Sequence, residues 1–290
     1  MSNLRLFVAC VAIWGSTWFA ITFQLGRVAP EASVFYRFLL ASLLLFAYCL
    51  ARRLPLRYTA REHAWIALQG VFMFSVSYIF VYYAEANVVS GLVAVGYSAS
   101  PLLGMLGMRA FFGTPMTARV AAGSALGILG IAIVFYPEIA HLKDGGRPVL
   151  GAMFTALAVV VSTFGSLAAH RNQQAKLALW QTMAWGMLYG ALFSLMVTVA
   201  SGRSLAFEAT APYVLSLLYL AILGSVIAFA GYLTLLARIG AARSGYIGVM
   251  VPIVALVISA AVEGFRWQAL TWIGIAVSVL GNIVILRGRQ

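Results

Sequence analysis

The sequence predicts an all-α polytopic membrane protein with ten transmembrane helices in two inverted five-helix repeats. Composition is the first observation behind this prediction, because 63% of the 290 residues are hydrophobic and only 9% are charged. Soluble domains carry near 25% charged residues. A helix needs ~20 consecutive apolar residues to cross the hydrocarbon core. Such windows recur along the whole chain, which excludes a soluble globular protein.

The predicted helices follow these apolar windows and are joined by short connections. Their ranges are 4–25, 32–51, 64–84, 88–109, 119–136, 149–169, 178–200, 213–236, 244–263 and 269–286. The longest connection carries prolines, a glycine pair and charges, and it divides the chain in two. We therefore expect a first repeat over residues 1–137, an external linker over 138–148 and a second repeat over 149–290.

An internal duplication is the second observation. The segment from Ala86 to Phe135 aligns without a gap with the segment from Ala237 to Leu286, and nine of the fifty positions are identical. Several identities are prolines or glycines, which fix backbone shape. At a constant offset these pairs are Pro101 with Pro252, Gly113 with Gly264, Gly123 with Gly274 and Gly130 with Gly281. Five helices per repeat is an odd number, so the second repeat is inserted upside down relative to the first.

The distribution of charge gives the orientation. Short cytoplasmic loops are enriched in Lys and Arg. With the N-terminus inside, 13 of the 19 basic residues lie on the cytoplasmic side, against the single acid Glu62. Both termini are then cytoplasmic, and the net charge of +12 reflects orientation in a lipid bilayer and requires no nucleic-acid partner.

Arg37 is the one basic residue that lies well inside a predicted helix, away from its ends. One interpretation is that its side chain extends to the outer headgroups. The alternative is a carboxylate contact or gate charge that pairs with Glu31 or Glu85.

Two prolines lie deep within predicted helices, Pro101 in the fourth and Pro252 in the ninth. Each frees the backbone carbonyl one turn earlier and kinks its helix. Lipid cannot satisfy such a carbonyl, so we expect both prolines to shape a central cavity, although a simple packing kink has the same pattern.

Aromatic and hydroxyl side chains are the candidate substrate ligands. In the third helix Ser75, Tyr78, Tyr82 and Glu85 share one face by their spacing. The other candidates are Thr17, Trp18, Tyr97, Ser98, Ser166, Trp185, Ser244 and Tyr246. Interfacial anchoring and helix packing are the competing interpretations for each one. Together they suit a neutral or zwitterionic molecule with an apolar body.

Several classes of function lack their residues. No Asp or Glu lies at the middle of a predicted helix, which disfavours an antiporter of cationic drugs. No hydrolase, nucleotide-binding or metalloprotease motif is present, so we expect no enzyme, no catalytic residue, no cofactor and no metal ion. Cys10 and Cys49 both fall in apolar helices and indicate no disulfide framework.

Local motifs add a family resemblance that covers nearly the whole chain. They are Ala12-Ile13-Trp14-Gly15-Ser16, Phe35-Tyr36-Arg37-Phe38 and the Ser100-Pro101 kink. The chain resembles the drug/metabolite transporter superfamily, EamA-type, and is similar to its aromatic amino-acid exporter branch. The resemblance implies a cavity lined by helices one, three, four, six, eight and nine, with Tyr78, Tyr82, Tyr97 and Ser98 near substrate. Ser100 replaces an aromatic residue found in several members, which leaves room for a broad specificity.

These features favour an exporter of amino acids in the bacterial inner membrane, working by alternating access. The alternative is a transporter of another small metabolite or a neutral drug, such as a nucleoside or a sugar derivative. The expected partners are the substrate and the bilayer, and the protein is a monomer or a weak homodimer. Small residues at Gly123, Gly127 and Gly130 fit either close helix packing or a dimer contact.

Overall fold

The computed structural model describes residues 2–115, 117–140, 147–244 and 246–287, and every regular element in them is a helix. The first repeat contains α1 (Asn3–Thr22), α2 (Pro30–Ala51), α3 (Ala60–Val71), α4 (Ser77–Glu85), α5 (Ser90–Gly96), α6 (Ser100–Phe112) and α7 (Ala118–Ala140). The second contains α8 (Arg147–Gln174), α9 (Leu179–Ala200), α10 (Ala211–Leu218), α11 (Ala228–Ser244), α12 (Tyr246–Val262) and α13 (Ala269–Arg287). Three tighter or wider segments interrupt these: π-helical η1 (Phe72–Val76) and η4 (Tyr219–Ile227), and the 3₁₀ segment η2 (Tyr97–Ala99).

When helices are counted as continuous through the π-helical and 3₁₀ segments, seven helices in the described residues are long and apolar enough to cross a membrane. Shorter apolar helices cover 121–137, 246–262 and 269–284. Two predicted boundaries are too short, since α8 runs to Gln174 and α11 to Ser244. The added turn of α8 is polar and that of α11 carries Arg238 and Arg243, and a helix keeps its backbone hydrogen bonds where its apolar window ends. Within the predicted linker, α7 ends at Ala140 and α8 begins at Arg147, and 141–146 lie outside the described residues.

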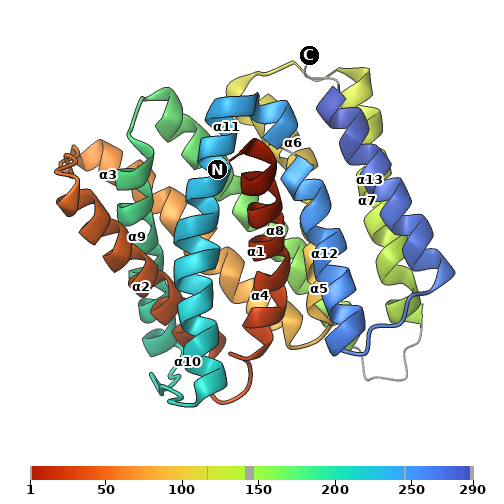
Figure 1. Ribbon diagram of the computed structural model, residues 1–290, viewed down its shortest axis with the longest axis horizontal. Helices are drawn as coiled ribbons and strands as arrows, with labels where there is room; N and C mark the ends of the chain where they lie inside the picture. The colour runs from red at the N-terminus through yellow and green to blue at the C-terminus, as the bar shows by residue number, and fades with distance from the viewer. Residues whose placement is uncertain (1, 116, 141–146, 245, 288–290) are drawn as a thin grey trace.

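The helices pack in pairs that relate the two repeats. α2 packs against α9, α5 against α12 and α7 against α13, each pair being equivalent in sequence position. Helices that are not equivalent also pack in corresponding pairs. α4 of the first repeat packs on α8 of the second, and α1 of the first repeat packs on α11 of the second. Figure 1 shows α7 and α13 side by side at one edge of the bundle and α2, α3 and α9 at the other. The duplicated sequence therefore produces duplicated packing.

Glycines close the contact between α7 and α13. A Cβ added at Gly274 would lie 2.7 Å from the carbonyl oxygen of Gly130, and one at Gly281 would lie 2.5 Å from that of Gly123. No side chain fits at these positions, so the two backbones pack directly on each other. The small-residue pattern around Gly127 thus joins two helices of one chain, and a dimer contact stays a prediction.

Two aligned glycines end corresponding helices. Gly113 after α6 and Gly264 after α12 have φ of +67° and +73°, the left-handed region in which L side chains are strained. Their identity in the two repeats follows from this shared backbone conformation.

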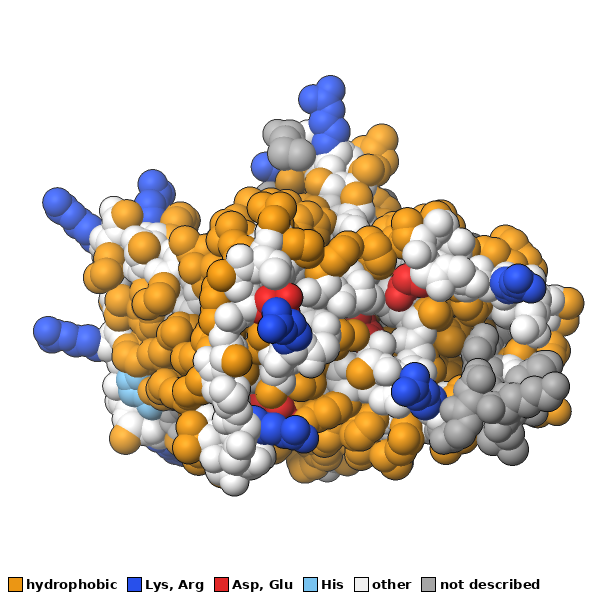
Figure 2. Space-filling model, turned by 90° about the horizontal axis from the view of Figure 1, so that it is seen from below, with side chains coloured by type: hydrophobic (Ala, Val, Ile, Leu, Met, Phe, Trp, Pro, Cys, Tyr) orange, Lys and Arg blue, Asp and Glu red, His pale blue; other side chains and the backbone are white. Residues whose placement is uncertain are grey.

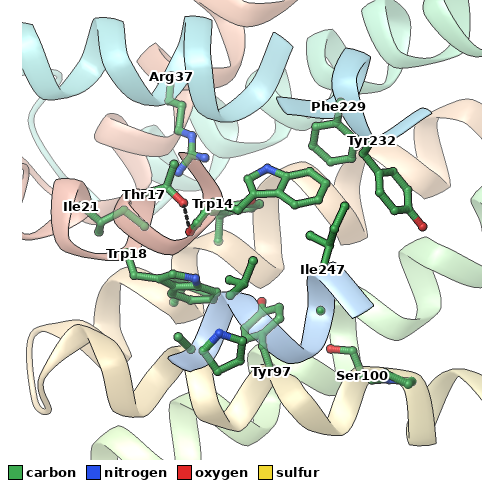
Figure 3. Close-up of a pocket in the computed structure, with 17 residues that line it drawn as sticks. Trp14, Thr17, Trp18, Ile21, Arg37, Tyr97, Ser100, Phe229, Tyr232 and Ile247 are labelled. Atoms are coloured by element: carbon green, nitrogen blue, oxygen red, sulfur yellow. Dashed lines mark hydrogen bonds between the residues drawn. The ribbon is translucent and has the colours of Figure 1, made fainter. Parts of the chain in front are cut away.

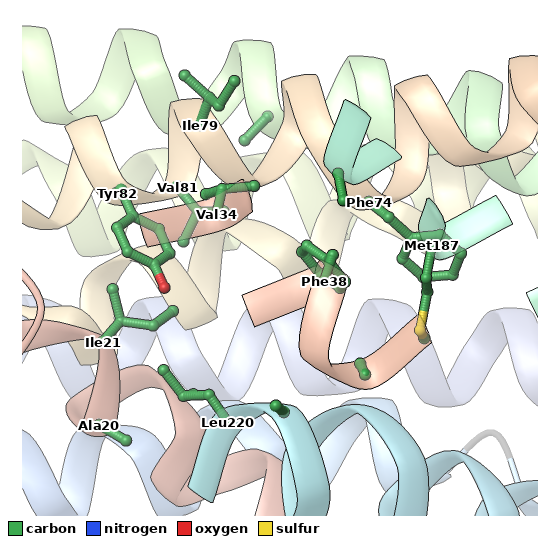
Figure 4. Packing of buried hydrophobic residues seen from close by; sticks show 14 of the residues in the cluster. Ala20, Ile21, Val34, Phe38, Phe74, Ile79, Val81, Tyr82, Met187 and Leu220 are labelled. Carbon is green, nitrogen blue, oxygen red and sulfur yellow. The ribbon is translucent and has the colours of Figure 1, made fainter. Parts of the chain in front are cut away.

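The largest apolar core lies where α2, α4 and α9 meet. Phe38, Phe74 and Met187 are almost completely buried there, and Figure 4 shows them in contact range, with Tyr82 farther along the cluster. The π-helical segment η1 lies in this core and carries Phe74 and Ser75. Such segments contain one wider turn, which shifts the faces of the residues that follow.

Candidate functional site

A central cavity of about 400 Å³ lies between the two repeats. Side chains of α1, α2, α4 and the α5–α6 region form one part of its wall, and α11 and α12 form the other (Figure 3). The lining residues are Trp14, Thr17, Trp18, Ile21, Arg37, Tyr78, Val81, Ala94, Tyr97, Ser100, Pro101, Phe229, Tyr232, Ile247, Gly248, Val251 and Pro252. Such a volume lies in the range of small-molecule pockets, which are mostly apolar with a few placed polar groups.

Aromatic rings form two opposite walls of the cavity. The Trp14 ring centroid lies 5.2 Å from that of Phe229 and 5.5 Å from that of Tyr232. On the other side the centroids of Trp18 and Tyr97 are 5.1 Å apart. These spacings are those of interacting aromatic pairs, so each wall contains packed rings from two different helices.

The Trp14 ring is held by a hydrogen bond to the second repeat. Its indole Nε1 donates to the carbonyl oxygen of Gly224 at 3.0 Å. Gly224 belongs to the π-helical segment η4, which occupies a position in the second repeat equivalent to that of η1 in the first. π-helical turns are rare and recur at functional sites. The contact therefore fixes an aromatic wall of the cavity on an irregular turn.

Both mid-helix prolines line the cavity, and so does the residue four positions before each. A proline at position i leaves the carbonyl of residue i−4 without its helical donor. These carbonyls belong to Tyr97 and Gly248, which are both lining residues. The two kinks differ, because the 3₁₀ segment η2 precedes Pro101, whereas α12 continues through Pro252. After its kink the first helix changes partners, since α5 packs on α12 and α6 packs on α8.

Arg37 is buried at the side of the cavity, with 2% of its surface exposed. Its guanidinium carbon lies 4.5 Å from the Tyr78 ring centroid and 5.2 Å from that of Phe38, within range of cation–π attraction. Its Nε and Nη1 have no hydrogen-bond partner. The interpretation that Arg37 extends to the headgroups is wrong, because packing on aromatic rings keeps the side chain inside the protein.

Neither expected carboxylate pairs with Arg37. Both oxygens of Glu85 are without a hydrogen-bond partner, as is Oε2 of Glu31. The other oxygen of Glu31 accepts a bond of 2.6 Å from the Tyr83 hydroxyl.

A second hollow, the vestibule, opens at the lower end of Figure 1, where α4 and α12 end and α8 begins. It has a volume of about 790 Å³ and a polar lining. Its charged residues are Glu85, Arg147, Glu263 and Arg266. Figure 2 views the molecule from this end and shows acidic side chains toward the middle of the face, with Lys or Arg side chains beside some of them.

A hydrogen-bonded cluster joins α5 and α12 beside the vestibule. Glu263 accepts bonds from the backbone N–H and the hydroxyl of Ser90, at 3.1 Å and 2.6 Å, and from the Ser259 hydroxyl. The Ser259 hydroxyl oxygen in turn accepts from the N–H of Gly91 at 2.8 Å. Hydrogen bonds to an ionised group are among the stronger ones in proteins. This cluster therefore keeps the two helices together at the end away from the kinks.

A membrane-embedded cavity between two sequence repeats is the arrangement expected of a carrier, and comparison with known proteins agrees. The model of the EamA-like transporter family matches residues 2–136 and again 149–287. The chain belongs to the EamA-like transporter family. It is a multi-pass membrane transporter of the drug/metabolite transporter superfamily with two EamA repeats.

Relatives of this EamA-like transporter span nearly the whole chain. It is 28% identical to the uncharacterized inner membrane transporter YedA of Escherichia coli (strain K12), over 99% of this chain and 92% of that protein. It is also 28% identical to a probable terminal-alkyne amino-acid exporter of Streptantibioticus cattleyicolor, over 97% and 92%. A solved structure with 18% identity has a TM-score of 0.71 and is covered to 99%, with all of this chain aligned. That likeness concerns the fold.

Seven of the residues singled out from the sequence of this EamA-like transporter line the cavity. They are Thr17, Trp18, Arg37, Tyr78, Tyr97, Pro101 and Pro252. They come from both repeats and from six helical segments, α1, α2, α4, η2, α6 and α12. Contact of these side chains with a substrate, and a gating role for Arg37 and the prolines, stay predictions.

Two residues of the third predicted helix lie away from the cavity. The Tyr82 ring is completely buried, and its hydroxyl donates to Oε1 of Gln24 at 2.6 Å. Ser75 is also buried, and its hydroxyl is 2.6 Å from that of Ser194 on α9. The shared face expected from helical spacing is interrupted by η1, whose wider turn separates Ser75 from Tyr78. Val81 occupies the cavity wall in place of Tyr82.

The other candidates have local roles in the structure. Ser98 faces a small gap beside α12 and α13, and the exposed Ser166 donates to the Ser162 carbonyl at 2.9 Å. Trp185 donates to the Leu56 carbonyl at 3.1 Å. Tyr246 is half-buried at the start of α12, outside the cavity lining. The side chain of Ser244 lies outside the described residues.

The sequence alone did not single out the apolar residues that line the cavity. Phe229, Ile247 and Val251 line the cavity from the second repeat, and no polar atom distinguishes them from residues that face lipid. Trp14 carried a usable signal, because a tryptophan within a membrane helix needs a partner for its N–H. Its spacing from Trp18 also places both on one face of α1.

Proposed function

We propose that this transporter exports amino acids across the bacterial inner membrane, with a specificity that is either aromatic or broad among neutral amino acids. The central cavity is the observation that carries the proposal. Its aromatic walls suit an apolar body, and its few polar groups suit the charged ends of a zwitterion. The relative from Streptantibioticus cattleyicolor, named a probable amino-acid exporter, adds support from sequence.

The proposed mechanism is alternating access by two inverted repeats of five membrane-crossing helices each, with both termini in the cytoplasm. The paired packing of α2 with α9, α5 with α12 and α7 with α13 suits a rocking motion of one repeat against the other. The Ser90–Glu263 cluster closes one end of the α5–α12 contact. At the other end α6 packs on α8, and we propose that this side provides cytoplasmic entry to the cavity.

Competition for uptake tests the proposal. The purified protein is reconstituted in liposomes, and entry of labelled phenylalanine or threonine is measured with and without an excess of unlabelled amino acids, nucleosides or sugars. We expect neutral amino acids to compete. If nucleosides or sugars compete and amino acids do not, the alternative of another metabolite or neutral drug is correct. The same assay with and without an imposed pH gradient measures whether transport is coupled to protons.

A further inference from the structure

Arg37 and the Ser100 hydroxyl are polar groups that line the central cavity and have atoms without a partner. Arg37 is 2% exposed, and its Nε and Nη1 are buried without a hydrogen-bond acceptor. The Ser100 Oγ is likewise buried and unpaired. In a folded protein more than nine in ten buried polar groups find a partner. Two exceptions in the wall of one cavity point to a partner that enters from that cavity.

The charge of Arg37 restricts what this partner can be. A guanidinium does not lose its proton in proteins, so burial cannot neutralise it. A buried charge without a counter-ion is strongly unfavourable. Cation–π contact with Tyr78 and Phe38 stabilises the positive charge but supplies no hydrogen-bond acceptor. Arg37 therefore lacks an anionic group with two oxygen acceptors, which a planar guanidinium binds through two parallel hydrogen bonds.

Among the acids whose side chains the structure describes, none pairs with Arg37 to supply this anion. Tyr83 occupies one oxygen of Glu31, and both oxygens of Glu85 are unpaired. Glu85 acts on Arg37 through the electric field, but it lines the vestibule and not the cavity. The Tyr82 hydroxyl donates to Gln24 and its oxygen interacts with the Arg37 side chain, but a neutral hydroxyl supplies no negative charge to balance the guanidinium.

The backbone around Arg37 leaves room for the guanidinium at the cavity wall. A Cβ added at Gly224 would lie 3.7 Å from Nη2 of Arg37 and 2.8 Å from Cγ2 of Thr17. The absence of a side chain there lets η4 approach both residues closely. Figure 3 shows Arg37 extending toward Thr17 and Trp14, with Ser100 at the opposite side of the group.

We propose that Arg37 is the carboxylate anchor of the cavity and limits its ligands to carboxylates with an apolar or aromatic body. The carboxylate lies against Arg37, and the body extends between the Trp14–Phe229 and Trp18–Tyr97 walls. This inference rests on the proposed transport function. It adds that the ligand must carry a carboxylate and that Arg37 binds this group.

A panel of phenylalanine relatives tests the carboxylate requirement in the wild-type protein. Phenylalanine, 3-phenylpropionate (no amine), phenylalaninamide (no carboxylate charge) and phenethylamine (no carboxylate) are added to the detergent-purified protein, and the increase in its unfolding temperature is measured. We expect the two carboxylates to stabilise the protein and the other two compounds to fail at tenfold higher concentration. Equal stabilisation by the amide and the amine would overturn the proposal.

Substitution of Arg37 gives the second measurement. Arg37→Gln is expected to lose at least tenfold in apparent affinity for phenylalanine and to lose the preference for carboxylates over the amide. Arg37→Lys keeps the charge and is expected to retain the preference with weaker binding. Arg171→Gln is the matched control, because Arg171 lies 4.8 Å over the Trp65 ring centroid and outside the cavity. An unchanged carboxylate preference in Arg37→Gln contradicts the proposal.

The outcomes separate this inference from the proposed function. If amino acids are transported but their amides compete equally well, the function holds and the carboxylate anchor is wrong. If apolar carboxylates such as 3-phenylpropionate bind and amino acids are not transported, the anchor holds and the proposed function is wrong. Should Arg37→Gln fail to fold, the ligand panel on the wild-type protein still decides the inference.

Discussion

The central cavity and the vestibule differ in the charged groups that line them. The cavity has aromatic walls and one buried cation without an acid beside it. The vestibule is larger and polar, and its two acids and two arginines share one space. α4 connects the two, with Tyr78 and Val81 in the cavity wall and Glu85 in the vestibule. From this difference we propose that selectivity is set in the cavity and that the vestibule contributes to closing one end.

The largest effect on transport is expected from filling the cavity. A Cβ at Gly248 would meet nothing within 4 Å, so the cavity wall has space for a side chain to begin there, and we expect the ring of Gly248→Phe to enter the cavity. We expect at least a tenfold loss of uptake in liposomes with an unchanged unfolding temperature. Gly104→Phe is the matched control, since a Cβ there also meets nothing within 4 Å and Gly104 lies outside the cavity. Equal losses in both variants would remove the cavity from the transport path.

The next effect separates Tyr78 from Tyr82 on the same helix. Tyr82→Ala removes a completely buried ring and is expected to lower the free energy of unfolding by about 3–5 kcal/mol. Tyr78→Ala removes a cavity wall and the cation–π partner of Arg37, so we expect weaker uptake with a smaller change in stability. Thermal unfolding and uptake are measured for both variants. Loss of uptake in a fully stable Tyr82→Ala protein would show that the core assignment of Tyr82 is wrong.

Glu263 tests the closure beside the vestibule. Glu263→Ala removes an acceptor of three hydrogen bonds, two of which join α5 to the end of α12, and we expect a destabilisation of about 2 kcal/mol. The control is Glu208→Ala, because Glu208 is half-buried and accepts a single bond of 3.2 Å from Thr210. The midpoint of thermal unfolding measures both. If the two variants unfold alike, the cluster does not hold the helices together.

The smallest effect is expected at Glu85. Both of its carboxyl oxygens are buried without a partner, so Glu85→Gln exchanges an unpaired acid for a neutral group of the same shape. We expect an unfolding temperature equal to or above that of the wild type and uptake within about twofold. A large loss of uptake here would give the vestibule a direct part in transport and would weaken the contrast with the cavity.

Much of the fold could be predicted from composition and pattern. Apolar windows mark membrane helices because lipid leaves no other way to satisfy the backbone, and the predicted helices correspond to the observed ones within a few residues at most ends. The boundaries at Gln174 and Ser244 could not be predicted, because hydropathy measures the apolar window and not the length of the helix. The π-helical segments left no sequence signal, and one of them separated Ser75 from the cavity-facing side of Tyr78.

The sequence by itself determined that the chain is a helical membrane protein built from two related halves. It also placed Pro101 and Pro252 as a pair, since prolines and glycines fix backbone shape wherever they occur. Only the tertiary structure decided which side chains share a space. A tyrosine of the core and a tyrosine of a cavity wall are alike in sequence, and so are an arginine that extends to headgroups and one enclosed by Phe38 and Tyr78. The surroundings that distinguish them come from other helices of the fold, and the spacing of residues within one helix does not show which helices are its neighbours.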